Sequence, residues 1–456
     1  MNKQTTMIVA VALVAVVIVA AAGVMLVNND SNESDAAIAS KLQIVGNLND
    51  DHTIDAQDMT VLEKLIKEEK TASEYPLADV NGDGALNEKD KENLQNLIDR
   101  KSGTPVRVIC VDRNGNNTTV SCTYPLRNVV PYGTNVQEPL LYANGGQYVA
   151  GYFVSSYKVA EASISDKAVN LKGSQRSITD AAWKNFTTLA ASLNNNIGAF
   201  IADYSGIAQI NDSRAADLEA AGIPLIIYKS ADATDEITTV LTLGFLFGGE
   251  CEKMGVDYAQ KSWNVLDQID KKVGGLSDSK KSSYISCNMY IYICQNDSTF
   301  NTSGMEAGGI PYYKVNSDFA TKYAGTSSVK MTSTEALSNY KDVDAILNNR
   351  SMDWCTTEEK LKETIIATWD HSNSGVSSTE YFKGFEDKLA YVNNLLPGAV
   401  KVAYMAHALY GDQFSLEWAD GVLKDFIDMG TNPLKGQSVD TVLAYIDVNV
   451  YKKATA

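Results

Sequence analysis

The hydrophobic pattern opens with one continuous apolar segment. Residues 7–27 (MIVAVALVAVVIVAAAGVMLV) contain no charged residue. A helix over this segment is long enough to cross roughly 30 Å of hydrocarbon at about 1.5 Å per residue. Lys3 precedes the segment and acidic residues follow it, which predicts that the rest of the chain lies outside the cell. We expect a membrane anchor at residues 1–28, with a cleaved signal peptide as the alternative, and a polar tether at 29–40.

Apolar residues at helical spacing predict two short helices in the next region. The apolar positions are Met59, Leu62, Leu65 and Ile66 in the first and Leu94, Leu97 and Ile98 in the second. Such spacing places the side chains on one buried helix face. A segment rich in Asp and Asn precedes each stripe, so this region consists of two loop–helix units.

From Val106 onward, runs of β-branched and aromatic residues alternate with helical patterns. The predicted strands are 107–111, 119–123, 128–131, 197–202, 224–228, 283–293, 345–347 and 400–403. Helical patterns such as 178–193 and 214–221 lie between them. This alternation predicts α/β units with mainly parallel sheets.

The middle of this region has no strand pattern. Two long helical patterns occupy residues 235–273, and the second, 249–272, carries Met254, Tyr258 and Trp263 at near-helical spacing. An α/β half, a long helix and a second α/β half predict two lobes joined by a rigid helix.

The loop before the second short helix has the ligand pattern of a calcium site. In residues 79–90, oxygen-bearing side chains hold positions 1, 3, 5, 9 and 12, and Gly84 holds position 6. Calcium takes about 6–8 oxygen ligands, which a loop of this length can supply by wrapping around the ion. The predicted ligands are Asp79, Asn81, Asp83, the carbonyl of Ala85, Asn87 and Asp90.

The loop before the first short helix repeats this pattern with weaker ligands. The predicted ligands are Asn47, Asn49, Asp51, Thr53 through its carbonyl, Asp55 and Asp58. Neutral Asn47 replaces Asp at position 1, and His52 stands at position 6, where glycine is expected. We therefore predict a weaker calcium site in this loop.

The paired units resemble a dockerin module, an EF-hand-like all-α fold. Both loops end in Asp, and the aliphatic residues Ile54 and Leu86 hold position 8. In that family the module binds a cohesin, so the resemblance implies calcium as a cofactor and a cohesin-bearing partner. An isolated structural calcium module is the alternative. We expect calcium to order this loop–helix module (residues 41–103) and to take no part in ligand binding by the lobes.

Composition and charge narrow the choice of partners. The chain has 456 residues, 45% of them apolar, which is enough for two or three domains with sizeable cores. A net charge of −17 without a basic stripe argues against nucleic acid, because phosphate contacts need clustered Lys and Arg. The six cysteines fit no metal motif. Cys110 and Cys122 flank a turn-rich stretch, which leads us to predict a disulfide across a hairpin.

Several segments after residue 104 together resemble one transport family. In chain order they are 125–130 (PLRNVV), 194–202 (NNNIGAFIA), 221–228 (AGIPLIIY), 243–251 (LGFLFGGEC), 332–338 (TSTEALS) and 342–346 (DVDAI). Their order and spacing are similar to those of the substrate-binding proteins of ABC importers for ferric siderophores, haem and cobalamin, although the usual Pro-Asp pair is missing from the second segment. The resemblance implies two Rossmann-like lobes with a ligand held between them.

The resemblance places the ligand at loops that follow strands, a location that open α/β sheets favour in general. The implied ligand contacts are Tyr132, Thr134, Asp203, Tyr204, Asn296, Phe300, Trp369, His371, Tyr404 and His407. Aromatic side chains could stack on a planar macrocycle, and histidines could bind its metal. Core packing is the alternative for any single aromatic residue.

The resemblance also implies a permease partner. Family members dock through one glutamate on each lobe; Glu335 matches the second-lobe position, and Thr187 stands at the first-lobe position. Arg176, Arg214 and Arg350 could pair with a negatively charged chelate, with surface ion pairs as the alternative.

The predicted fold class is therefore α/β: two Rossmann-like lobes joined by a long rigid helix, preceded by the small all-α dockerin-like module and an N-terminal transmembrane helix. The predicted boundaries are 1–28, 29–40, 41–103, 104–232 (N-lobe), 233–278 (linking helices) and 279–456 (C-lobe). No catalytic motif is recognisable, so we expect a binding protein rather than an enzyme. The leading hypothesis is a membrane-anchored extracellular receptor that passes a metal chelate to an ABC permease. The alternative is a cell-surface adhesion or scaffold protein recruited through cohesin, without transport.

Overall fold

The computed structural model describes the chain from residue 41 to residue 456, with short gaps. The segments outside the description are 1–40, 156–160, 162, 230–231, 289–291, 295–298, 323–327, 331–338, 355–356, 371, 374–375 and 378–381. The predicted membrane anchor and tether lie in the first of these segments. Among the described residues, no helix has both the length and the apolar character needed to cross a membrane.

The loop–helix module contains the two helices that its apolar stripes predict. Helix α1 spans Ala56–Lys67 and helix α2 spans Glu88–Ile98. Each begins with a capping box, which satisfies backbone N–H groups of the first turn. The leucines at the predicted core positions are all buried: Leu62, Leu65, Leu94 and Leu97.

A β-hairpin follows the module. Strands β1 (Thr104–Val111) and β2 (Asn117–Tyr124) pair antiparallel, which confirms the two strands predicted here. Cys110 lies opposite Thr118 and Cys122 opposite Val106, and both thiols are free and buried. The predicted disulfide is wrong, because the turn at residues 112–116 sets a register that separates the two cysteines along the ladder.

The N-lobe is a parallel sheet covered by helices. Its strands are β3 (Val130–Tyr132), β6 (Phe200–Asp203) and β7 (Leu225–Tyr228), in the order β3-β6-β7, with a second parallel pair, β4 (Gly151–Val154) and β5 (Val169–Ser174). Its helices are α3 (Thr134–Tyr142), α4 (Asp180–Ser192) and α5 (Asp212–Ala220). The parallel strands end at one edge of the sheet, so the loops that follow them lie close together.

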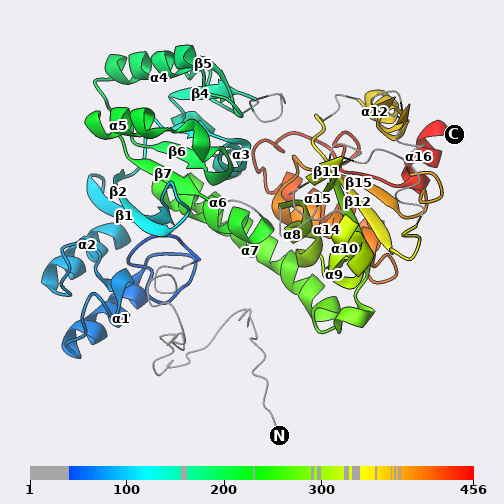
Figure 1. Ribbon diagram of the computed structural model, residues 1–456. Helices are drawn as coiled ribbons and strands as arrows, with labels where there is room; N and C mark the ends of the chain where they lie inside the picture. The colour runs from blue at the N-terminus through cyan, green and yellow to red at the C-terminus, as the bar shows by residue number, and fades with distance from the viewer. Residues whose placement is uncertain are drawn as a thin grey trace, which may run out of the picture.

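Two long helices connect the lobes, as the sequence predicts. Helix α6 spans Ala233–Phe247, and helix α7, Glu250–Ile269, runs from the N-lobe to the C-lobe (Figure 1). The turn between them is made by Gly248 and Gly249, both with positive φ. A Cβ on Gly248 would lie 2.4 Å from the Tyr124 hydroxyl oxygen, so this turn also packs directly against the hairpin.

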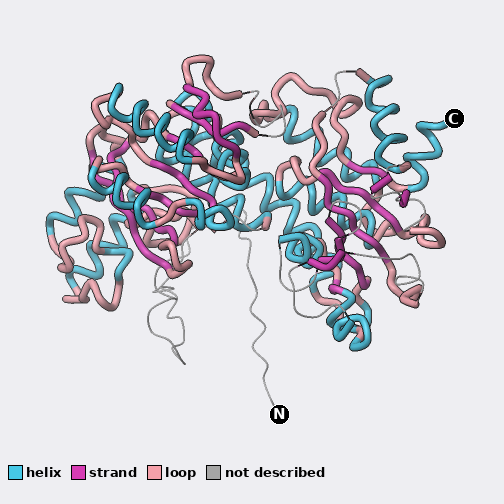
Figure 2. The backbone as a smooth tube through the Cα atoms, turned by 45° about the horizontal axis from the view of Figure 1, so that its top comes forward, coloured by secondary structure: helices cyan, strands magenta, loops and turns pink. Residues whose placement is uncertain are grey.

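The C-lobe is a larger mixed sheet. Its centre is parallel: β8 (Ser283–Asn288), β12 (Ala345–Arg350) and β15 (Leu389–Asn393). The other strands are β9 (Tyr292–Cys294), β10 (Ile310–Pro311), β11 (Ser328–Lys330) and β16 (Tyr445–Ile446), with β13 (Ser372–Asn373) and β14 (Val376–Ser377) as a separate pair. The helices are α8 (Thr299–Glu306), α9 (Tyr312–Val315), α10 (Ser317–Lys322), α12 (Glu358–Trp369), α14 (Gly398–Leu409), α15 (Leu416–Asp428) and α16 (Val448–Thr455). Figure 2 shows the strands of the two lobes as separate groups with helices around them.

Two strand predictions in the C-lobe are wrong. Residues 283–293 do not form one strand, because β8 ends at Asn288 and β9 returns antiparallel beside it. Residues 400–403 lie inside helix α14, whose apolar residues are buried on most sides. A short apolar run in a buried helix cannot be told from a buried strand by periodicity alone.

The loop–helix module packs against the rest of the chain. Ile44 forms an antiparallel bridge with Val108 of β1, and the Val45 N–H donates to the Arg107 carbonyl at 2.9 Å. One hydrophobic core includes residues of the module, the hairpin and both linking helices. The module is therefore continuous in space with the hairpin, although a sequence boundary was predicted between them.

Side chains fix the module to the linking helices as well. The Gln43 N–H donates to the Thr242 hydroxyl of α6 at 3.0 Å. Arg100, just beyond α2, donates through Nε to Glu252 of α7 at 2.9 Å, and its guanidinium lies 4.8 Å from the Phe245 ring centroid. These contacts give the module a defined orientation relative to α6 and α7.

Candidate calcium and ligand-binding sites

The second predicted calcium loop, residues 79–90, is folded around the side chain of Asp79. The Asp79 carboxylate accepts hydrogen bonds from the N–H groups of Gly82 (2.9 Å) and Gly84 (3.2 Å). Both glycines have left-handed backbones, with φ of 79° and 83°. Side chains disfavour this conformation, so the sharp turn of the calcium pattern depends on glycine here.

Asp90 closes the same loop from its other end. Its carboxylate accepts from the N–H groups of Asn81 (3.1 Å) and Asn87 (2.9 Å). The predicted ligands are thus gathered into one turn, and oxygen atoms are what calcium requires. Among the described residues, no three His, Cys, Asp or Glu side chains are placed to hold a metal by themselves. A calcium ion in this loop would therefore also need amide and carbonyl oxygens, including those of Asn81 and Ala85.

The first loop closes in the same way in a buried setting. Asp58 accepts from the N–H groups of Leu48 (2.6 Å) and Asp55 (2.8 Å). Burial raises the pKa of Asp58 to about 6, against the opposing effect of these hydrogen bonds. His52 stands at position 6 without a left-handed backbone, and Asp50, with φ of 56°, makes the turn instead. The weaker site in this loop stays a prediction.

One arginine holds each loop. Arg107 of β1 donates to the Asp79 carbonyl and lies 3.7 Å from its carboxylate. Arg100 donates to the Ile54 carbonyl (3.0 Å) and the Thr53 hydroxyl (3.2 Å) of the first loop. Arg107 thus joins the second predicted calcium loop to the hairpin, and Arg100, which also bonds to Glu252 of α7, joins the first loop to the linking helices.

Four of the predicted ligand contacts meet at the carboxyl edge of the N-lobe sheet. Tyr132 ends β3, Thr134 begins α3, Asp203 ends β6, and Tyr204 begins the turn that follows. A Cβ on Gly133 would lie 2.4 Å from the Asp203 Cβ, so the loops after β3 and β6 approach closely. This edge is where open α/β sheets bind ligands.

The polar groups of this edge are largely buried. Asp203 accepts from the N–H (2.9 Å) and hydroxyl (2.7 Å) of Ser205. Burial raises the pKa of Asp203, and the hydrogen bonds from Ser205 oppose the rise. The Tyr132 hydroxyl is buried without a hydrogen-bond partner in the described part of the chain, and burial raises its pKa to about 12.

Sequence reasoning missed three groups at the same edge. Gln175 accepts from the Gly133 N–H at 2.6 Å and so fixes the loop after β3. Lys229 directly follows β7, lies 5.4 Å from the Tyr204 ring centroid, and donates to the Gly115 carbonyl at 2.7 Å. The position of Lys229 directly after a predicted strand could have identified it as a residue of this edge. The third group is the hairpin turn at Gly115, and no sequence pattern predicted that it would lie here.

Three of the predicted C-lobe contacts lie away from strand ends. Trp369 is buried at the end of α12. Tyr404 lies within α14 and donates to Asp420 at 2.8 Å, and His407 Nδ1 lies 2.8 Å from the Phe414 carbonyl. The expected loop placement of Tyr404 and His407 is wrong because residues 400–403 are helical.

Of the remaining residues predicted in the C-lobe, the structure describes the position of Phe300. Phe300 lies near the start of α8. Asn296, His371 and the predicted docking residue Glu335 lie outside the described residues. Sequence reasoning missed Asn348 in β12, which is fully buried and has no hydrogen-bond partner for either amide atom in the described chain.

A buried polar cluster lies where the lobes meet. Glu236 of α6 accepts from the Gly398 N–H at the start of α14 (2.6 Å) and from the Tyr258 hydroxyl of α7. The Tyr142 hydroxyl of α3 donates to the Leu395 carbonyl at 3.1 Å. The first bond ties the C-lobe to α6, the second ties α7 to α6, and the third joins the N-lobe directly to the C-lobe.

Arginine 214 was expected at the surface or at a chelate. Its side chain is instead buried, donating to the Gln209 carbonyl (2.7 Å) and to Asp180 (3.0 Å). Arg214 is therefore a structural residue of the N-lobe.

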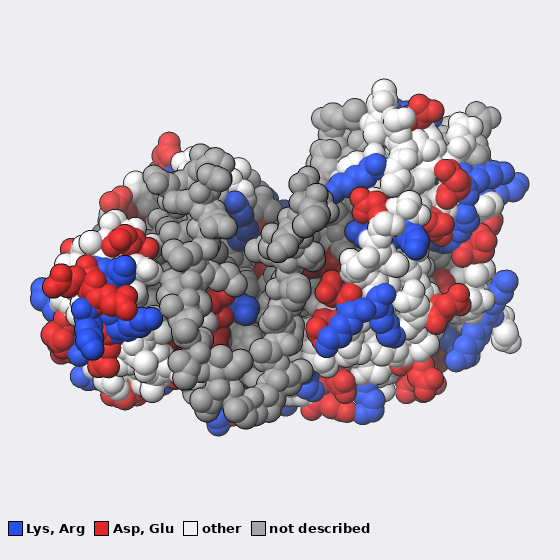
Figure 3. All heavy atoms as spheres, turned by 90° about the horizontal axis from the view of Figure 1, so that it is seen from below, with Lys and Arg blue, Asp and Glu red and all other residues white. Residues whose placement is uncertain are grey.

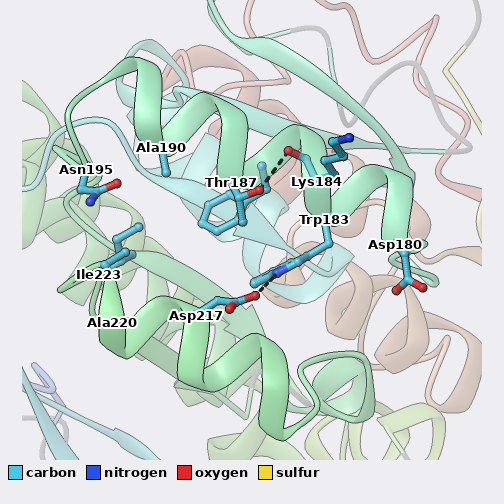
Figure 4. A pocket seen from close by; sticks show the side chains of 11 residues that line it. Asp180, Trp183, Lys184, Thr187, Ala190, Asn195, Asp217, Ala220 and Ile223 are labelled. Carbon is cyan, nitrogen blue, oxygen red and sulfur yellow. Dashed lines mark hydrogen bonds between the residues drawn. The ribbon is translucent and has the colours of Figure 1, made fainter.

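A cavity of about 520 Å³ lies between α4 and α5. Figure 4 shows its lining, in which Trp183 donates to Asp217 at 2.8 Å. Thr187, the residue at the expected first-lobe docking position, also lines it. The cavity is bounded by helices rather than by strand ends, so it is distinct from the N-lobe edge described above.

Figure 3 shows one face of the molecule, seen from below. Acidic and basic side chains are intermixed on the part of this face that is described. This distribution agrees with the absence of a basic stripe in the sequence.

Two parts of the chain are similar to different known proteins. Residues 45–99 match the family model of the dockerin type I domain. The TroA-like periplasmic binding protein FepB from Veillonella parvula superimposes with a TM-score of 0.50 and 15% identity, covering 75% of this chain and 99% of FepB. The two-lobed region has the TroA-like binding-protein fold. No curated protein matches the chain in sequence.

Other solved structures show lower similarity. Helicobacter pylori CeuE with Ni(II) bound has a TM-score of 0.48 and 12% identity, covering 73% of this chain and 98% of CeuE. The periplasmic haem-binding protein RhuT from Roseiflexus has a TM-score of 0.41 and 14% identity, covering 63% of this chain and 99% of RhuT. In this chain, residues 45–99, which match the dockerin type I model, precede a region with the TroA-like binding-protein fold.

Proposed function

We propose that this chain is the extracellular binding component of an ABC importer for a metal chelate of the ferric siderophore, haem or cobalamin type. The convergence of Tyr132, Thr134, Asp203 and Tyr204 at the carboxyl edge of the N-lobe, on a TroA-like fold, carries this proposal. The ligand would lie against this edge and face the C-lobe, where Asn296, Phe300 and His371 remain candidate contacts. Trp369, Tyr404 and His407 would support the C-lobe core instead.

In this proposal the dockerin domain binds calcium and recruits a cohesin-bearing protein at the cell surface. The N-terminal apolar segment would anchor the chain to the membrane, and Glu335 would contact the permease. The proposed role involves binding and delivery, with no catalytic step.

The test is a binding screen of the full chain against haem, cobalamins and ferric siderophores, read by absorbance and thermal shift. A ligand at 100 times its dissociation constant stabilises the folded state by about 2.7 kcal/mol, which a thermal shift detects. No stabilisation by any of these chelates would count against the proposal.

The N-lobe edge is tested with a matched pair of variants. Tyr204→Ala removes a ring that could stack on a macrocycle, whereas Tyr204→Phe keeps it. We expect the alanine variant to weaken binding of the chelate found in the screen and the phenylalanine variant to bind nearly normally. Equal binding by both variants would remove Tyr204 from the site.

The alternative function is a surface adhesion or scaffold protein that binds through the dockerin domain without transport. The family match at residues 45–99 is the observation that favours it. Calcium-dependent capture of a purified cohesin, together with no chelate binding and no effect on uptake, would support this alternative.

A further inference from the structure

The second calcium loop is joined to the hairpin by one side chain. Arg107 is only 21% exposed, donates to the Asp79 carbonyl, and donates through Nη2 to the Thr119 hydroxyl of β2 at 3.2 Å. A Cβ on Gly82 would lie 3.1 Å from the Arg107 Nε, so this side chain also packs along the loop. One guanidinium therefore contacts the first calcium position and the facing strand of the hairpin.

The hairpin extends from this contact to the carboxyl edge of the N-lobe sheet, and its two strands are paired along their whole length. Every residue from Thr104 to Val111 is paired with one from Asn117 to Tyr124 in a continuous register. On its other side, Ile109 N–H donates to the Gln43 carbonyl at 2.9 Å. A two-stranded ladder supported in this way is expected to move as a unit.

The far end of the hairpin touches the N-lobe edge. Lys229 donates to the Gly115 carbonyl at 2.7 Å, and a Cβ on Gly115 would lie 2.6 Å from the Tyr204 hydroxyl oxygen. Arg113 pairs with Asp212 at the start of α5. The turn thus holds the side chains that follow β6 and β7, one of which is the predicted ligand contact Tyr204.

We propose that calcium occupancy of residues 79–90 is coupled, through Arg107 and the hairpin, to the position of Tyr204 and Lys229. Without the ion, the carboxylates of Asp79, Asp83 and Asp90 repel one another, and the loop loses the order that presents the Asp79 carbonyl to Arg107. With the ion, that acceptor is fixed and the hairpin is held at its base. Such coupling is reciprocal, so a ligand that orders Tyr204 would also tighten calcium binding.

This inference replaces the expectation that calcium takes no part in ligand binding. It rests on calcium binding by the loop and on contacts of this chain, and it requires neither a particular chelate nor import. It can therefore fail while the proposed function holds, and the reverse is also possible.

The test measures amide hydrogen exchange of the full chain with and without calcium as the only added ligand. We expect calcium to slow exchange in residues 79–90 and also, by about 5-fold or more, in the hairpin turn and in residues 203–206. In Arg107→Ala, calcium should still protect the loop, but the protection at the turn and at residues 203–206 should be lost.

Arg100→Ala is the matched control, because it cuts a different link between the module and the receptor and leaves Arg107 in place. Calcium should still protect the turn in this variant. Asp58→Asn, in the first loop, should also retain the effect, whereas Asp90→Asn should abolish it.

Three outcomes would overturn the proposal. They are an absence of calcium binding by calorimetry, an unresponsive hairpin turn in the native chain, and undiminished protection of the turn in Arg107→Ala. If Arg107→Ala does not fold, Thr119→Val with Lys229→Met cuts the same path at two other points and should give the same loss of protection.

Discussion

The two predicted calcium loops, within the residues that match the dockerin model, are closed by similar hydrogen bonds at position 12 but have different surroundings. In each, the Asp at position 12 accepts from two or more loop N–H groups and completes the capping box of the helix in which it lies. The second loop has Asp at position 1 and is held by Arg107 of the hairpin. The first loop has Asn at that position and is held by Arg100, which is bonded to α7.

Because of this difference, we expect the two copies of the motif to have different roles. The second loop has the stronger predicted ligand set and faces the hairpin that reaches the carboxyl edge of the N-lobe sheet. The first loop has a buried carboxylate with a raised pKa and faces the linking helices. The four predictions below test whether the roles differ in this way.

The largest effect is expected from the core shared by both loop–helix units. Leu94→Ala should lower the free energy of unfolding by about 2–5 kcal/mol, because the side chain is fully buried. Leu62→Ala, its counterpart in the first unit, should cost a similar amount. Chemical denaturation of the calcium-free chain measures both. A loss under about 1 kcal/mol for either would mean that its unit is not part of the common core.

The next effect is a pH dependence specific to the first loop. The folded pKa of Asp58 is raised from 3.8 to about 6, so the folded state binds its proton more tightly than the unfolded state. The resulting stability is fully present below pH 3.8 and is lost as the pH rises through 6, by up to about 3 kcal/mol. Asp58→Asn should flatten this part of the stability curve of the calcium-free chain. An unchanged curve would contradict the assignment.

Calcium affinity should separate the two loops directly. Asp90→Ala removes the carboxylate that closes the second loop, and we expect roughly 100-fold weaker binding there, about 2.7 kcal/mol. Asp58→Ala should remove only the weaker binding event. Titration calorimetry distinguishes the two events, and loss of the tighter one in Asp58→Ala would reverse the ranking.

The smallest expected effect is an increase in the calcium affinity of the first loop. Asn47→Asp restores a charged ligand at position 1 of the first loop and should strengthen its calcium binding by roughly tenfold, about 1.4 kcal/mol. Asn47→Gln keeps the neutral amide and is the control. If neither variant changes the affinity of this loop, its weakness must come from His52 at position 6.

Local patterns predicted much of the fold. The apolar stripes that include Leu62, Leu65, Leu94 and Leu97 predicted both helices of the loop–helix module, because amphipathic periodicity indicates which helix face is buried. The long helical pattern at residues 249–272 identified α7. Strand-end reasoning brought Tyr132 and Asp203 to one edge because parallel strands share that edge.

Other features of the fold depend on tertiary packing and could not be predicted from the sequence. Residues 400–403 combine three apolar residues with Lys401, a pattern that fits a short strand as well as a helix, and only the packing of α14 shows that they are helical. That error displaced Tyr404 and His407 from the predicted site. The partners of Arg100 and Arg107 lie in other elements, 152 residues away in the case of Glu252, and no local pattern records such a contact.

The bond between Arg100 and Glu252 also has a mechanical consequence. Because Arg100 joins the end of α2 to α7, and Gln43 joins the chain before the first loop to α6, tension applied to the dockerin domain passes into the two linking helices. Helix α6 also bonds to both lobes, to the N-lobe through the Leu126 N–H and to the C-lobe through the Gly398 N–H. Force applied to residues 45–99 would therefore act directly on the two helices that connect the lobes.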